Sequence, residues 1–89
     1  MNETLEVLMY EVDVQIEECK DLLKDAKHDI KKLEKSKADV LETGIADYVF
    51  DDNINRILAL KEKLEKRLNV LKKVKYRLVV SERMLKSLE

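Results

Sequence analysis

The chain has 89 residues and a formal net charge of -1; 42% of its residues are charged, 4% are aromatic, one is glycine and none is proline. This length allows one domain at most, and the composition is typical of long helices and excludes a β-sandwich or barrel. No apolar run reaches the roughly 18 residues needed to span a membrane, and the first residues lack the pattern of a cleaved secretory signal.

An apolar stripe runs through the first half of the chain, with alternating spacings of four and three residues. The stripe comprises Leu5, Met9, Val12, Ile16, Cys19, Leu23, Ala26, Ile30, Leu33, Lys37 and Val40. This unbroken heptad spacing predicts a helix over about residues 3–42, with one face packed against another helix. Asn2 or Thr4 can cap its start, and Glu3 and Glu6 suit the positive end of its dipole.

The only glycine, Gly44, follows this stripe at the place where a helix commonly ends in a left-handed residue. The heptad phase also slips before Phe50, and a continuous helix would not need that slip. Residues 43–46 are therefore predicted to form a turn. Asp47 is the expected N-cap of a second helix over about residues 47–88.

A second apolar stripe repeats every seven residues after the turn. It comprises Phe50, Ile57, Leu64, Leu71, Leu78 and Leu85. Two such stripes predict an all-α fold, in which one domain over residues 1–89 forms an antiparallel two-helix hairpin with coiled-coil-like packing. A turn centred near Ile45 also predicts which residues face each other. The predicted pairs include Cys19 and Leu71, Ile16 and Val74, Ile30 and Leu60, and Lys37 and Asn53.

The charges are segregated along the chain in a way that favours the antiparallel arrangement. Residues 1–23 carry seven acids and one base, whereas residues 54–89 carry eleven bases and four acids. An antiparallel hairpin sets these two segments side by side, so that opposite charges face each other.

Apolar residues outside the two stripes predict a protein interface near the chain ends. The predicted interface comprises Val7, Leu8, Tyr10, Val14, Tyr76, Val79, Val80 and Met84. One seam between two helices buries little apolar surface, so a second apolar surface is expected to meet a partner. The expected partner is a second copy, which would complete a homodimeric four-helix bundle; a different protein is the other possibility.

The sequence contains no pattern that predicts catalysis, a cofactor, a metal site or a small-molecule substrate, and no enzyme is expected. Asp25 and His28 have the carboxylate–histidine spacing of di-iron bundles, but His28 falls opposite the stripe. Asp51 and Asp52 suit the N-terminal turn of a helix. Cys19 occupies the stripe and is expected to be a buried thiol. As the sole cysteine it favours a reducing compartment, the cytoplasm of a cell or of an infected host.

Two functions remain open on these observations. The first is a small protein-interaction module: an adaptor, a chaperone-like protein or an inhibitor subunit, of the kind that viruses and mobile elements encode. The alternative is a helical hairpin that binds nucleic acid through a belt of lysines at mid-length. The lysines proposed for that role are Lys24, Lys31, Lys32, Lys63, Lys66 and Lys73. No membrane partner is expected, because acids crowd the apolar face of the first segment.

Overall fold

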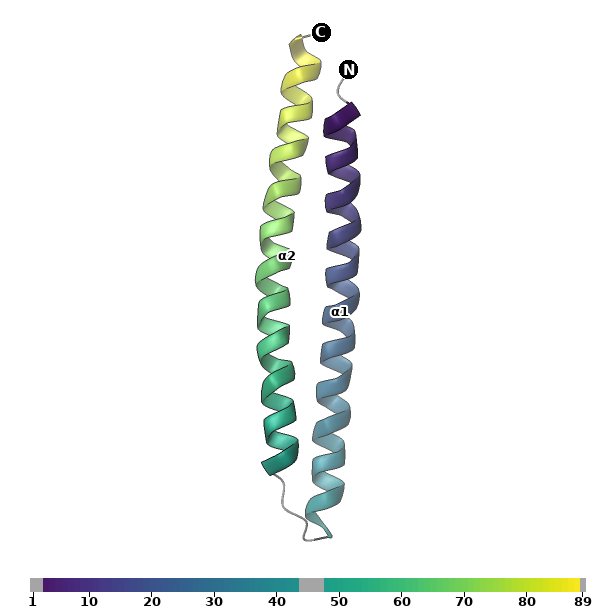
Figure 1. Ribbon diagram of the computed structural model, residues 1–89, viewed down its shortest axis with the longest axis vertical. Helices are drawn as coiled ribbons and strands as arrows, with labels where there is room; N and C mark the ends of the chain where they lie inside the picture. The colour runs from purple at the N-terminus through teal and green to yellow at the C-terminus, as the bar shows by residue number, and fades with distance from the viewer. Residues whose placement is uncertain (1–2, 44–47, 89) are drawn as a thin grey trace.

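The computed structural model describes residues 3–43 and 48–88. They form two long helices, α1 (Glu3–Leu41) and α2 (Tyr48–Leu88). The helices lie side by side and run in opposite directions, with both chain ends at the same end of the rod (Figure 1). The molecule measures 71 × 14 × 14 Å, so its only interior is the seam between the two helices. The predicted all-α hairpin is confirmed, whereas Gly44 and Asp47 lie outside the described residues.

The seam surface of α1 agrees with the predicted stripe at every position. All eleven stripe residues are buried or half-buried, and Asp13 is the only other described residue of α1 that is not exposed. Burial is deepest in the middle of the helix, at Ile16, Cys19, Leu23 and Ala26. A heptad stripe with one interruption, Lys37, leaves the helix a single way to bury its apolar surface.

The seam surface of α2 differs from the prediction in every second layer. The predicted residues Leu60 and Val74 are 50% and 41% exposed, while Ile54 is buried and Leu68 is half-buried. The helix is thus rotated so that the row of Ile54, Lys61, Leu68 and Lys75 enters the seam beside the predicted stripe. The aliphatic stems of the two lysines cover apolar neighbours, and their ammonium groups reach acids at the seam edge.

The apolar core of the seam gathers residues from both helices. Cys19 donates a hydrogen bond from Sγ to the main-chain carbonyl of Leu64, at 3.2 Å, and shares the apolar core with Leu71, its predicted partner. Leu68 packs against the same core from the row that the prediction left outside the seam. Ile16 and Leu23 also belong to this core.

Candidate protein interface

One flank of the seam is lined by ion pairs. Lys75 Nζ lies 2.7 Å from Asp13 Oδ1, and Lys37 Nζ lies 2.5 Å from Asp51 Oδ1, each pair joining the two helices. Lys61, one residue of the same seam row, pairs with Glu65 within α2 at 3.7 Å. We call this side the ionic flank; it comprises Asp13, Lys37, Asp51, Lys61, Glu65 and Lys75. Charged side chains thus connect the two helices on this flank.

The other flank of the seam is apolar and open. Gln15, Leu22 and Arg67 line a shallow depression there, which shows that the rows containing these residues meet across the groove. Leu8 shares the row of Gln15 and Leu22 by its spacing of seven residues, and Leu60 and Val74 share the row of Arg67. We call this surface the groove face; it comprises Leu8, Gln15, Leu22, Leu60, Arg67 and Val74. Its four apolar side chains are between 41% and 52% exposed.

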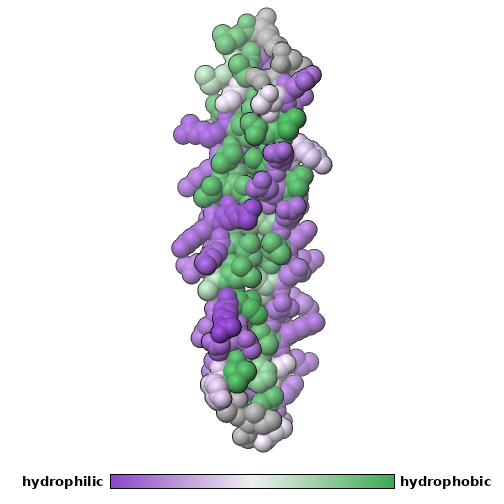
Figure 2. Space-filling view, viewed as in Figure 1, coloured by the Kyte–Doolittle hydropathy of each residue, from purple (hydrophilic) through white to green (hydrophobic). Residues whose placement is uncertain are grey.

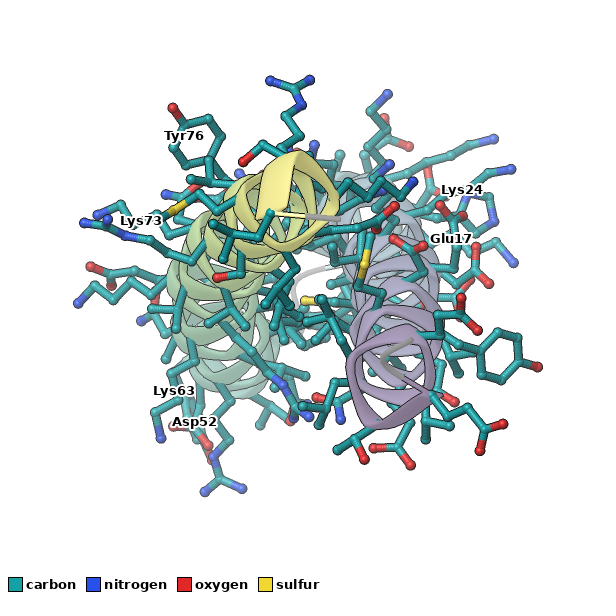
Figure 3. All side chains as sticks on the ribbon, turned by 90° about the horizontal axis from the view of Figure 1, so that it is seen from above. Glu17, Lys24, Asp52, Lys63, Lys73 and Tyr76 are labelled. Carbon is teal, nitrogen blue, oxygen red and sulfur yellow. The ribbon has the colours of Figure 1, made fainter. Side chains whose placement is uncertain are left out.

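The apolar residues of the groove face alternate with polar ones, because Gln15 lies between Leu8 and Leu22 and Arg67 lies between Leu60 and Val74. Figure 2 shows hydrophobic surface along the groove between the helices, interrupted in places by hydrophilic side chains and bordered by them on both sides. Lys63, one helical turn before Arg67, projects from the lower side of α2 in Figure 3, which is the side that Figure 2 faces. Because exposed apolar patches with polar rims mark interaction sites, this surface is the best candidate interface of the hairpin.

The structure does not bring the predicted interface residues together on one surface. Val7, Leu8, Tyr10 and Val14 are exposed on α1, as are Tyr76 and Met84 on α2, whereas Val79 and Val80 are half-buried. Of these eight residues, only Leu8 belongs to the groove face. In Figure 3, Tyr76 projects away from α1, and Glu17, seven residues after Tyr10, projects away from α2. The two tyrosines therefore lie on separate edges of the hairpin.

The lysines of the proposed nucleic-acid belt are also spread around the molecule. All six are exposed. Figure 3 shows Lys24, Lys63 and Lys73 projecting in three different directions, so that no single face gathers them. Lys66 lies 3.6 Å from a carboxylate oxygen of Glu62, which offsets part of its charge. Together these observations weaken the case for a belt that follows one nucleic-acid backbone.

The structure places Cys19 and His28, the two residues that the sequence analysis considered for chemical roles, in ordinary surroundings. Cys19 is buried and its thiol donates to a backbone carbonyl, which confirms the prediction from its place in the stripe. His28 is exposed beside Lys24, Asp25 and Lys31. Within residues 3–43 and 48–88, no group of three or more His, Cys, Asp or Glu side chains is placed to hold a metal ion.

Sequence reasoning missed Leu60, Arg67 and Val74 as surface residues, because it assigned their row to the seam. The positions of Asp13 and Asp51 in the sequence could have indicated the rotation of α2. Each acid forms an ion pair with the ammonium group of a lysine in the seam. A lysine can bury its aliphatic stem in a seam while its ammonium group stays at the seam edge. The row with Lys61 and Lys75 could therefore enter the seam if acids lay beside it.

Comparisons of this chain with protein-family models, curated proteins and solved structures find no match. Over the described residues, neither helix has a stretch long and apolar enough to cross a bilayer. The geometry of the groove face itself indicates what the surface can do. It offers a partly apolar surface between two helices, a shape that can accept one or two further helices.

Proposed function

We propose that this chain is a small non-enzymatic protein-interaction module that binds helical surfaces through its groove face. The observation that carries the proposal is the partial exposure of Leu8, Leu22, Leu60 and Val74 along one flank of the seam. Full burial of a large apolar side chain is worth about 1.5–3 kcal/mol, and each of these residues leaves roughly half of that unrealised. Helices laid along the groove would recover it.

The simplest such partner is a second copy, which would make a homodimeric four-helix bundle with coiled-coil-like packing. Two hairpins placed groove face to groove face would convert two thin seams into one four-helix core. Adaptors, chaperone-like proteins and inhibitor subunits act through surfaces of this kind. The single buried thiol suits the cytoplasm of a cell or of an infected host.

Nucleic-acid binding is the second candidate, and one observation favours it. Tyr76 is exposed beside Lys72, Lys73 and Arg77, around a shallow depression on α2. An aromatic ring among cations is the arrangement that stacks a base while holding the backbone phosphates. The patch is small, however, and the other lysines of the belt face elsewhere, so the groove face supports the first proposal better.

A pair of matched substitutions in α2 tests the proposed interface. Leu60 lies on the groove face and Leu58 lies on the opposite flank, and both are leucines of similar exposure. We expect the unaltered protein to have twice the mass of one chain by light scattering. Leu60→Glu should halve that mass, because it places a charge in the proposed interface, and Leu58→Glu should leave it unchanged.

The same experiment distinguishes the competing surfaces. Loss of the dimer in Leu58→Glu but not in Leu60→Glu would move the interface to the ionic flank. Loss only in Tyr10→Asp with Val80→Asp would move it to the residues predicted from the sequence. If the unaltered protein is monomeric up to about 1 mM, corresponding to a very weak Kd, self-association is wrong.

A further inference from the structure

The groove face is bordered by two rows of opposite charge. On α1, the row at the edge of the groove comprises Glu11, Glu18, Asp25, Lys32 and Asp39, which we call the acidic row. On α2, the corresponding row comprises Arg56, Lys63, Val70, Arg77 and Met84, which we call the basic row. Glu18 lines the same depression as Leu22 and Arg67, which fixes the acidic row at the groove. All ten residues are exposed.

These rows limit how two copies can meet. Two groove faces can be apposed by a two-fold axis parallel to the rod or by one perpendicular to it, in the plane of the interface. The parallel axis lays α1 of each copy on α2 of the other, and turn meets turn. The perpendicular axis lays α1 on α1 and α2 on α2, and the turns point to opposite ends. Only the first arrangement brings each acidic row against a basic row.

The heights of the charged residues match in that first arrangement. Asp13 contacts Lys75 within the chain, so residues two positions outward on each helix, Glu11 and Arg77, lie at nearly the same level. A parallel axis preserves height, and Glu11 of one copy therefore meets Arg77 of the other. Asp25 and Lys63 lie level with each other for the same reason, so Asp25 of one copy meets Lys63 of the other. In the part of the chain that the structure describes, none of these four side chains is held in an ion pair.

We propose that the hairpin forms a homodimer with its two-fold axis parallel to the rod, in which the acidic row of each α1 packs along the basic row of the partner's α2. This arrangement rests on the proposed function of the groove face and adds the orientation of the partner. The same-charge contact that it creates, Lys32 against Arg56, is moderated by Asp52, whose carboxylate lies 3.2 Å from the guanidinium of Arg56. The perpendicular axis would instead set the two acidic rows against each other along α1, and each row carries four acids and one lysine.

Distances between identical labels test the orientation directly. With Cys19→Ala as background, Ser87→Cys or Glu42→Cys carries one spin label near one end of the rod, outside the groove face. The proposed dimer gives a distance of about 20–35 Å for both variants, the width of a four-helix bundle with labels on its outside. The perpendicular axis gives a distance near the 71 Å length of the rod. The Cys19→Ala background is first shown to keep the mass and helicity of the unaltered protein.

Charge reversal provides an independent measurement. Glu11→Arg with Asp25→Lys should weaken the dimer at least about tenfold at low salt, because four opposite-charge contacts become repulsive. Adding Arg77→Glu and Lys63→Asp should restore most of the affinity. Under the perpendicular axis neither Glu11 nor Asp25 faces Arg77 or Lys63 of the partner, so the second pair of changes does not compensate for the first.

The outcomes separate this inference from the proposed function. A dimer disrupted by Leu60→Glu whose labels are far apart refutes the parallel axis and leaves the groove face as the interface. A monomeric protein refutes both the orientation and self-association. A dimer with short label distances and no response to charge reversal refutes the pairing of the acidic and basic rows.

Discussion

The two flanks of the seam differ in the side chains that border the apolar layers between the helices. Both border the same apolar layers, and both leave a thin two-helix core beside water. On the ionic flank, lysines from the seam reach Asp13 and Asp51 on the opposite helix, and their stems cover the layers. On the groove face, leucines and valines border the layers and remain partly exposed. Ion pairs within one chain border the first flank, whereas under the proposed function a partner would cover the second.

Under the proposed function, this difference leaves the hairpin with one flank suited to association. Exposed ion pairs are worth little in stability, but they keep water-compatible groups at the surface and oppose association on that side. On the groove face, four partly exposed leucine and valine side chains lie along one flank of the seam. Under the proposed function, a partner would meet the hairpin on this flank.

The largest effect is expected in the seam on which both flanks depend. Leu64→Ala removes a buried side chain from the apolar core and should lower the free energy of unfolding by about 2–4 kcal/mol. Leu58→Ala, at an exposed position of the same helix, should cost less than about 1 kcal/mol. Urea denaturation followed by circular dichroism measures both. Equal costs would mean that α2 is rotated differently from the structure described here.

The groove face should show the next largest effect, and only when the protein is concentrated. Leu22→Ser with Val74→Ser should remove about 2 kcal/mol of stabilisation at concentrations where dimers form, because two half-exposed side chains no longer meet a partner. The Tm of the unaltered protein should rise with concentration, and that of the double variant should not. Leu41→Ser with Leu58→Ser, of similar exposure on the other flank, is the control and should retain the concentration dependence.

A smaller effect is expected on the ionic flank. Asp13→Asn breaks a pair whose side chains are about half exposed, so it should cost only about 0.5 kcal/mol at low salt. The difference should nearly vanish in 1 M NaCl, where the screening length is about 3 Å. Asp21→Asn, at an exposed position away from the seam, serves as control. A cost above about 2 kcal/mol would show that this pair holds the helices together, contrary to the comparison of the flanks.

The smallest effect is expected from lysines outside both flanks. Because these lysines project in different directions, the unaltered protein should pass an RNA or DNA column at about 50 mM salt without retention. Lys66→Glu with Lys73→Glu should then leave the elution volume and the helicity unchanged. Retention of the unaltered protein that this double variant abolishes would instead support the nucleic-acid alternative.

Much of the fold followed from local pattern. The stripe of α1 was predicted residue by residue, since ten apolar residues at heptad spacing with polar residues around them permit only one buried face. The stripe of α2 was predicted at Phe50, Ile57, Leu64, Leu71 and Leu78, and wrongly at Leu85, which is 40% exposed near the chain end. The chain also determined two helices and their antiparallel direction, through the single glycine region and the segregated charges.

Only the tertiary structure decided how α2 is rotated, and with it the groove face. The row of Leu60 and Val74 and the row of Ile54 and Leu68 each contain two large apolar residues among polar ones, so the local sequence of α2 favours neither strongly. The choice depends on the opposite helix, where Asp13 accepts the charge of Lys75 once that row is turned inward. A contact between residues 62 positions apart cannot be read from the pattern of either helix alone, because its energy exists only when both helices are in place.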